Sequence, residues 1–305
     1  MPDATDNLTI DPRLLQRLKG VELRSRFLVR GLYENRHRTK DFGASNEFVE
    51  HKSYQQGDEI RTIDWRAFAR TKRLYVKRFE MEANMKVHLL LDTSASMQVP
   101  ASDGRLSKLD LAATIAGAIA MMAADQQDSP GLFCIGDQID EAIPACQGKR
   151  HLALLFQHLG RPPGKGGGDF GALAWDAMQR IGRKGVTVVL TDALDDFEPL
   201  FETLKGLVVR EQDVILLQIM DEDELTFPFD VMTEFRHPES GQRIMGDPMQ
   251  LRADYLERLE AHQNELRTFC DQHGIDYLRI HNGDDLITLL SSHFLHRLAR
   301  GGARC

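Results

Sequence analysis

The sequence has few cysteines and no paired cysteine motif. Its 305 residues include only four, and these lie far apart, at Cys134, Cys146, Cys270 and Cys305. Without a C-x-x-C pair, neither a zinc site nor a dithiol redox motif is expected. The N-terminal sequence MPDATDN lacks the basic segment and apolar stretch of a secretory signal. We therefore expect free thiols in a reducing compartment and a cytoplasmic location.

Long hydrophobic runs are also missing. The longest apolar run, Leu111 to Ala124, is shorter than the roughly 18–20 residues that a helix needs to cross a bilayer, so no transmembrane segment is predicted. The net charge of −8 is unevenly spread, because residues 1–86 contain 18 Lys+Arg and 13 Asp+Glu, whereas residues 87–305 contain 20 and 33. This asymmetry predicts two units. Basic residues are interleaved with acidic ones and no nucleic-acid-binding motif accompanies them, so nucleic acid is not an expected partner.

Hydrophobic periodicity predicts a small N-terminal segment followed by an α/β domain. Residues 1–84 combine helical spacing between Asp11 and Leu32 with β-rich stretches between Asn46 and Glu82, and we expect them to pack on the next domain as an appendage. Over residues 85–300, strands alternate with helices, which predicts a doubly wound, mainly parallel sheet with helices on both faces. A hairpin insertion is expected near 222–250, where two proline-containing stretches interrupt the alternation.

Oxygen-bearing side chains follow two of the predicted strands. Asp92, Ser94 and Ser96 follow strand 87–91, and Asp192 follows strand 186–190. In an open α/β sheet, ligands bind beyond the carboxyl ends of the strands. One carboxylate with several neutral oxygens suits a hard divalent cation, Mg²⁺ in particular. The alternative is that these residues cap helices and satisfy backbone donors in loops.

The D-x-S-x-S pattern after a buried strand, with a later strand that ends in Asp, resembles the metal-ion-dependent adhesion site (MIDAS) of von Willebrand factor A-type domains. A second resemblance rests on the upstream segments Tyr54–Asp58, Arg61–Arg66, Ala69–Thr71 and Leu74–Arg78 and on the downstream Pro238–Gly241. These segments resemble the signature of the bacterial family called domain of unknown function fifty-eight, whose members are commonly associated with MoxR-type AAA+ ATPases. The resemblance covers about residues 20–298 and implies a von Willebrand factor A-like (Rossmann-like) fold.

The resemblance implies a metal site at Asp92, Ser94 and Ser96, with Asp192 as the late carboxylate that usually reaches the ion through water. The middle loop departs from the family pattern, because Gly168 stands where the family has a threonine whose hydroxyl contributes to the site. A water or Asp169 can supply the missing oxygen. The alternatives are a weaker site for Mg²⁺ or Mn²⁺, or a scaffold that binds no metal.

A basic and aromatic segment within the N-terminal part has two interpretations. Its charged residues can hold an irregular β-segment together through charge-assisted hydrogen bonds. Alternatively they form a docking surface, because arginine and aromatic residues are enriched at the cores of interfaces. The residues that would bind a partner are Arg61, Asp64, Trp65, Arg66 and Arg70.

Two functions remain open. The resemblance implies a non-enzymatic interaction module, in which the metal leaves one position for a carboxylate of a client protein and a MoxR-type AAA+ ATPase is a partner. The alternative is a phosphohydrolase of the haloacid-dehalogenase type, with Asp92 as the nucleophile and Asp192 as a ligand of Mg²⁺. That chemistry wants a carboxylate two residues after the nucleophile, where this chain has Ser94. We therefore expect no enzymatic activity.

Overall fold

The computed structural model of the chain describes residues 18–38, 51–53, 70–71, 73, 75–77, 84–161, 169–194, 197–238 and 241–301. The chain divides into two compact units. The α/β unit comprises Met1–Arg36 and Met85–Cys305, and the small unit comprises His37–Asn84. The predicted boundary near residue 84 therefore coincides with a division between the units.

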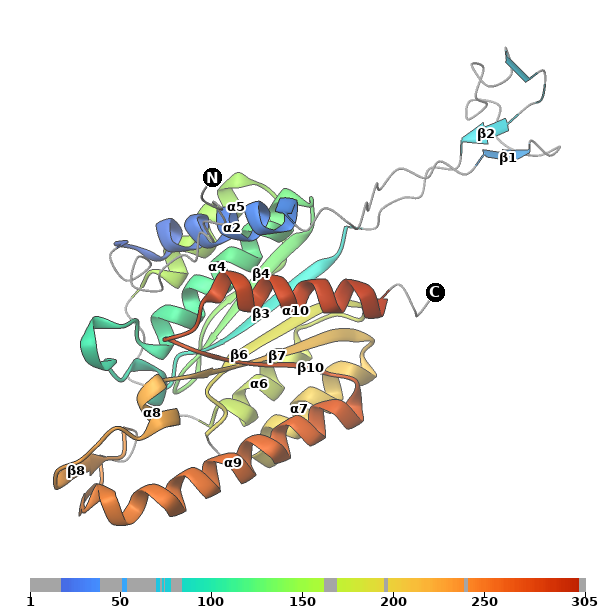
Figure 1. Cartoon of the computed structure of the whole chain (residues 1–305). Coiled ribbons are helices and arrows are strands. Elements are labelled where there is room, and N and C mark those ends of the chain that lie inside the picture. Colours follow the sequence, from blue (N-terminus) through green and yellow to red (C-terminus); the bar gives the residue numbers. More distant parts are fainter. Residues whose placement is uncertain are drawn as a thin grey trace, which may run out of the picture. The chain divides into compact units, whose positions relative to one another are not determined.

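A six-stranded sheet forms the centre of the α/β unit (Figure 1). Its strand order is β10-β7-β6-β3-β4-β5, and all neighbours are parallel except β4 and β5. Strand β3 is buried at six of its seven positions, as expected for an apolar strand covered on both faces. The strands are β3 (Lys86–Asp92), β4 (Ser129–Ile135), β5 (Ile139–Ile143), β6 (Gly185–Thr191), β7 (Gln212–Met220) and β10 (Asp276–His281).

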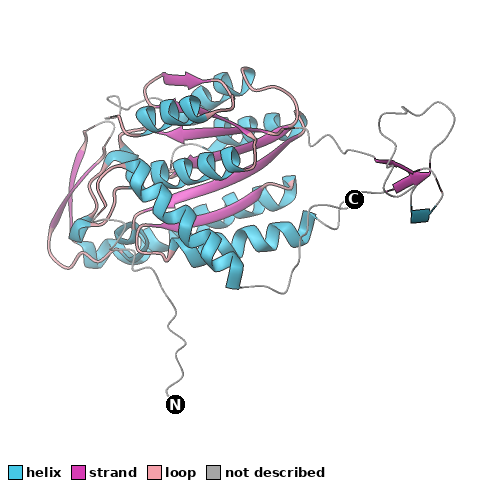
Figure 2. Cartoon of the chain, turned by 90° about the horizontal axis from the view of Figure 1, so that it is seen from above, coloured by secondary structure: helices cyan, strands magenta, loops and turns pink. Residues whose placement is uncertain are grey.

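Helices cover both faces of this sheet, as Figures 1 and 2 show. One hydrophobic cluster joins the sheet to α4 (Lys108–Asp125), α5 (Lys149–Leu159) and α10 (Leu286–Gly301). A second cluster joins the other face to α6 (Phe170–Gln179), α7 (Phe197–Val209) and α9 (Pro248–His273). The predicted doubly wound, mainly parallel class is confirmed.

Helix α4 lies at the end of a segment, Ser102–Asp125, that is long and apolar enough to cross a membrane by length and composition alone. However, 61% of its most apolar window is buried inside the unit. Its residues Leu111, Ile115 and Ala116 pack in the first hydrophobic cluster. The apolar character of α4 is therefore explained by its place against the sheet.

Helix α2 (Val21–Arg38) differs from the prediction of one N-terminal appendage over residues 1–84. It belongs to the α/β unit, and its Leu28, Val29 and Leu32 are buried in the cluster around α4. The Ser25 hydroxyl donates a 2.8 Å hydrogen bond to the Thr114 carbonyl of α4. The prediction of one appendage is wrong here because α2 uses its apolar face to cover α4, whereas His37–Asn84 forms a unit of its own.

The small unit contains an antiparallel pair of short strands, β1 (His51–Ser53) and β2 (Tyr75–Lys77). In the α/β unit, β7 is followed by α8 (Glu222–Thr226) and by the antiparallel hairpin β8 (Thr233–Arg236) and β9 (Arg243–Gly246). This hairpin lies within the insertion predicted near 222–250. Helix α9 then starts at Pro248 after Asp247, whose side chain caps it by accepting the Met249 N–H.

Candidate functional site

The candidate site lies at the carboxyl ends of β3 and β6. From β3 the chain crosses through α4 to β4, toward one edge of the sheet, and from β6 it crosses through α7 to β7, toward the other edge. The crevice between neighbouring strands whose connections diverge is the usual ligand position of such sheets. Asp92 ends β3 and Asp192 directly follows β6. Because Leu91 pairs with Leu190, Asp92 is level with Thr191, and Asp192 follows one residue later.

Asp92 is a fully enclosed carboxylate that is bonded only by uncharged donors. The residue is 1% exposed. The Ser94 backbone N–H donates to Oδ1 at 2.9 Å, and the Thr191 hydroxyl donates to Oδ2 at 2.6 Å. Within the part of the chain that the structure describes, no lysine or arginine forms an ion pair with Asp92.

Burial, and to a smaller extent the charge of the neighbouring Asp192, raises the pKa of Asp92 from 3.8 to about 7. The hydrogen bonds from Thr191 and Ser94 act in the opposite direction but are outweighed. The pKa is raised because, among the described residues, no positive charge pairs with the ionised form of Asp92 in its buried position. A cation bound at this carboxylate would favour the ionised form.

The two serines of the predicted site face each other. Ser94 is buried, and its Oγ lies 3.0 Å from the Oγ of Ser96, the half-buried first residue of the short 3-10 helix η2 (Ser96–Gln98). Gln98 Nε2 donates to the Thr93 carbonyl at 2.8 Å and so ties η2 to the loop. The strand-end spacing thus brings Asp92, Ser94 and Ser96 together, as predicted from the sequence.

Asp192 is buried as well, but it has a cationic partner that the sequence did not suggest. Lys108 Nζ donates to Asp192 Oδ2 at 2.8 Å and to Glu224 Oε1 at 2.6 Å. Burial lowers the pKa of Lys108, but Asp192 and Glu224 outweigh burial and the pKa is raised. The lysine is therefore ionised. The one sequence signal for its role is that Lys108 is the sole basic residue of the mainly apolar α4.

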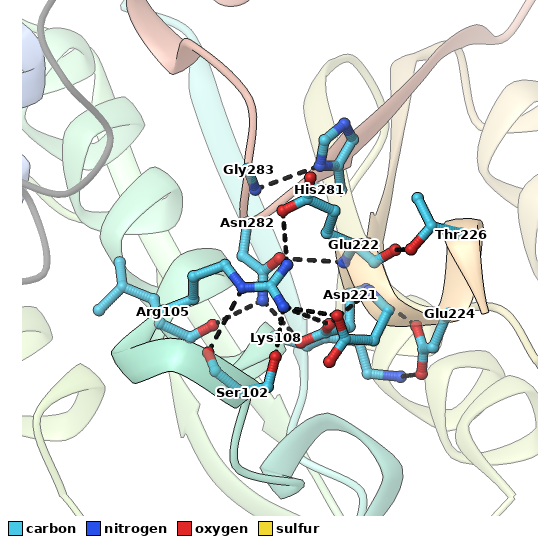
Figure 3. Close-up of polar contacts among 12 residues, drawn as sticks. Ser102, Arg105, Lys108, Asp221, Glu222, Glu224, Thr226, His281, Asn282 and Gly283 are labelled. Carbon is cyan, nitrogen blue, oxygen red and sulfur yellow. Dashed lines mark hydrogen bonds and ion pairs between the residues drawn. The ribbon is translucent and has the colours of Figure 1, made fainter. Parts of the chain in front are cut away.

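Helix α8 is held beside this ion pair by a group of polar residues that we call the α8 clamp: Arg105, Lys108 and Asn282 with Asp221, Glu222, Asp223 and Glu224 (Figure 3). Arg105 pairs with Glu222 and with Asp223, at 2.6 Å each. Asn282 donates to Asp221 Oδ2 at 2.6 Å. Glu224 also accepts the Asp221 backbone N–H at 2.9 Å, which completes a capping box.

Asp169 has a local role in this structure. It is exposed and is the N-cap residue of α6, where its Oδ1 accepts the Ala172 N–H at 3.1 Å. This is the capping role that aspartate commonly has at helix starts. Gly168 and the rest of the glycine loop lie outside the described residues, so the effect of the missing threonine stays a prediction. Of the predicted partner-binding residues, Arg61, Asp64, Trp65 and Arg66 also lie outside them, and Arg70 is exposed.

The donor set at Asp92 fits a hard divalent cation. Carboxylate and hydroxyl oxygens are the ligands that Mg²⁺ uses, completed by water. Among the described residues, no group of three or more His, Cys, Asp and Glu side chains forms a metal site. A metal at this position therefore depends on the serine hydroxyls as well as on Asp92.

The sheet is doubly wound and mainly parallel, and it carries the Asp-Ser-Ser loop at its switch point. The chain matches the family "Protein of unknown function DUF58" over residues 50–265, which is more than half of its length. It belongs to this family, domain of unknown function fifty-eight, as the resemblance predicted.

Similar proteins include uncharacterized proteins of Mycobacterium tuberculosis and Mycobacterium bovis, each 26% identical over 261 residues, covering 84% of this chain and 81% of theirs. Among solved structures, the hypothetical protein BatB of Bacteroides thetaiotaomicron has 16% identity and a TM-score of 0.45, covering 71% of this chain and 99% of that one. An aerotolerance-related membrane protein of Bacteroides fragilis has 17% identity and a TM-score of 0.45, with coverages of 70% and 99%. The von Willebrand factor A domain of SpRpn10 has 12% identity and a TM-score of 0.38, with coverages of 68% and 93%.

Proposed function

We propose that this chain is a non-enzymatic protein–protein interaction module whose contact point is the Asp92 loop with a bound Mg²⁺ or Mn²⁺ ion. The observation that carries the proposal is the Asp92 carboxylate itself. It is 1% exposed and bonded only by neutral donors, and Asp192 lies beside it at the switch point of the sheet. A buried carboxylate without a compensating charge is costly, and a divalent cation removes that cost.

Asp92, Ser94 and Ser96 would hold the ion, with water in the remaining positions. When bound, the ion supplies a positive centre with an exchangeable position that a carboxylate oxygen of another protein can fill. Ser96 is the most accessible of the three residues, so the approach of a partner is expected from its side of the loop. Asp192, which is paired with Lys108, would act on the ion from further away, through water.

The proposed partners follow from the family resemblance. They are a MoxR-type AAA+ ATPase and client proteins that offer an exposed aspartate or glutamate. The segment with Arg61, Asp64, Trp65, Arg66 and Arg70 is the proposed second docking surface, because arginine and aromatic side chains anchor interfaces well.

The phosphohydrolase alternative receives less support from the site. An attacking carboxylate must reach the phosphorus atom of a substrate, whereas Asp92 is only 1% exposed. The position two residues later is occupied by the Ser94 hydroxyl, which is bonded to Ser96 and is a poor acid.

The proposal predicts that association with a candidate MoxR-type ATPase depends on both the ion and Asp92. Binding measured by calorimetry in Mg²⁺ should weaken about tenfold or more in Asp92→Asn, which keeps the shape of the side chain and removes its charge. A chelator should weaken the wild type to the same level. The control is Asp176→Ala, which removes an exposed carboxylate of α6 and should leave binding unchanged. Equal binding by wild type and Asp92→Asn, with and without chelator, would remove the metal bridge from the proposal.

A further inference from the structure

Lys108 is the feature of the site that the proposed interaction does not explain. Its side chain is 3% exposed, and its ammonium group lies between Asp192 and Glu224. Lysine is seldom buried so completely, and when it is buried it needs paired acidic groups. The two partners are 84 and 116 residues away in the chain, so the arrangement is made only by the folded structure.

The position of Lys108 within α4 makes this pairing more informative. Ser107 is the N-cap residue of α4, so Lys108 is the first residue of the helix. The N-terminus of a helix carries a partial positive charge, which disfavours a cation there. Burial and the helix dipole therefore both oppose an ammonium group at this place, and the negative charge of Asp192 and Glu224 is what retains it.

The charges around Lys108 do not balance. The ammonium group pairs with two carboxylates, the buried Asp192 and the half-buried Glu224. The enclosed carboxylate of Asp92 lies near Asp192 and has no ion pair of its own among the described residues. An ammonium group and a divalent ion that share Asp192 repel each other, because both are cations in an enclosed and weakly screened place. Whatever binds beside Asp92 must compete with a cation that is already attached to the chain.

We propose that Lys108 is a tethered cation that competes with a divalent ion for the negative charge of Asp192 and thereby weakens divalent-ion binding at the Asp92 loop. This inference rests on the metal site of the proposed function and names the residue that sets its affinity. Ion binding shifts Lys108 away from Asp192 and toward Glu224, which belongs to the capping box of α8. Occupancy of the Asp92 loop is therefore coupled to the order of α8, and the coupling is reciprocal.

The test compares Mn²⁺ binding by wild type and Lys108→Met, followed by calorimetry and by the paramagnetic resonance signal of free Mn²⁺. Lys108→Met removes the charge and keeps an unbranched side chain of similar length. The expected result is about tenfold or greater tightening of Mn²⁺ binding, because the competing cation is gone. The matched control is Lys149→Met, which changes the first residue of helix α5, where the lysine is exposed. This control should bind Mn²⁺ like wild type.

A second variant tests the proposal in case Lys108→Met does not fold, since Asp192 and Glu224 both lose their partner in Lys108→Met. The double variant Lys108→Met with Glu224→Gln lowers the unpaired charge and keeps Asp192, and it should show the same tightening. Thermal unfolding supplies an independent measurement. Both variants should gain more in melting temperature from added Mn²⁺ than wild type gains.

The outcomes separate this inference from the proposed function. Equal Mn²⁺ affinity in wild type and both Lys108 variants, including no binding by any of them, would overturn the tethered cation. Tighter Mn²⁺ binding by the variants would support the tethered cation. If association of wild type with its partner were at the same time insensitive to chelator, only the metal bridge would be contradicted.

Discussion

His88 is a buried residue of β3 whose ring nitrogens both lack a hydrogen-bond partner in the structure. The residue is 6% exposed, and the centroid of its ring lies 6.4 Å from the centroid of the Phe133 ring. Burial, and to a smaller extent Lys86, lowers the pKa of His88 from 6.5 to about 4. The folded protein therefore keeps His88 neutral at pH values where the unfolded chain binds a proton.

Replacing His88 is predicted to change how stability depends on pH. Above pH 6.5 both states of wild type hold a neutral His88, so its effect is constant; as the pH falls toward 4, only the unfolded state gains the proton and stability is lost. At pH 5 this loss is roughly 2 kcal/mol. Urea unfolding at pH 7.5 and pH 5 should show a smaller decrease in His88→Leu than in wild type. Equal decreases in the two proteins would contradict the prediction.

The residues of the candidate site differ in how well the sequence reveals them. Asp92, Ser94 and Ser96 lie within five positions after one buried strand, so a local pattern suffices to predict that they meet. The sequence allows Asp169 as an additional ligand, but in the structure its side chain accepts a hydrogen bond from a backbone N–H of α6. Lys108 and Glu224 could not be predicted, because no local pattern tells which carboxylates a lysine meets after folding.

At the scale of the elements, the contact between α2 and α4 depends on a residue without a side chain. A Cβ atom added to Gly117 would lie 2.7 Å from Cε1 of Phe156 and would also overlap the Ser25 hydroxyl of α2. These separations are too short for carbon and oxygen atoms that are not bonded. Gly117 is therefore explained by the close approach of α2 and α5 to α4.

Gly117→Ala is predicted to destabilise the protein although alanine favours helices. The gain in helix propensity of about 1 kcal/mol is outweighed by overpacking, for a net loss of roughly 1–2 kcal/mol. The measurement is the free energy of unfolding in urea. Gly182→Ala is the control, since no atom lies within 4 Å of its added Cβ, and it should change stability by less than about 0.5 kcal/mol. An unchanged stability of Gly117→Ala would show that α2 does not approach α4 so closely.

Helix α8 shows what long-range contacts add to a short element. Its five residues are too few to form a stable helix in isolation. The capping box that starts it is local, whereas Arg105, Lys108 and Asn282 of the α8 clamp come from distant parts of the chain. The sequence predicts an insertion here, but only the tertiary structure shows that α8 lies against the N-terminal end of α4.

At the scale of the whole molecule, the α/β unit is discontinuous in sequence. The Tyr33 hydroxyl of α2 donates to Asp125 at 3.4 Å, and the Met85 N–H donates to Asp128 at 2.8 Å. The segments before and after His37–Asn84 are thus both bonded to residues at or just after the C-terminal end of α4. The small unit is inserted between two segments that fold together.

Replacing residues 39–83 by a short Gly/Ser linker is predicted to leave the α/β unit folded, with one cooperative thermal transition close to that of the full chain. Deleting residues 1–84 should lower the melting temperature much further, because it removes the buried Leu28, Val29 and Leu32. Each such side chain contributes about 1.5–3 kcal/mol when buried. Circular dichroism and calorimetry provide the measurements. If the two deletions are equally stable, α2 is not part of the α/β unit in solution.

The amino-acid sequence by itself determined the doubly wound sheet, the family and the Asp-Ser-Ser loop, because strand periodicity and strand-end spacing are local properties that survive without knowledge of distant contacts. The tertiary structure decided that α2 covers α4, that Asp169 caps α6 and that Lys108 neutralises Asp192. Two of these outcomes depend on groups about 85 to 90 residues apart, whose pairing is selected by packing and by the cost of burying an unpaired charge. The third outcome, the cap of α6, is a local hydrogen bond at Asp169, a residue for which the sequence suggested only a role as a metal ligand.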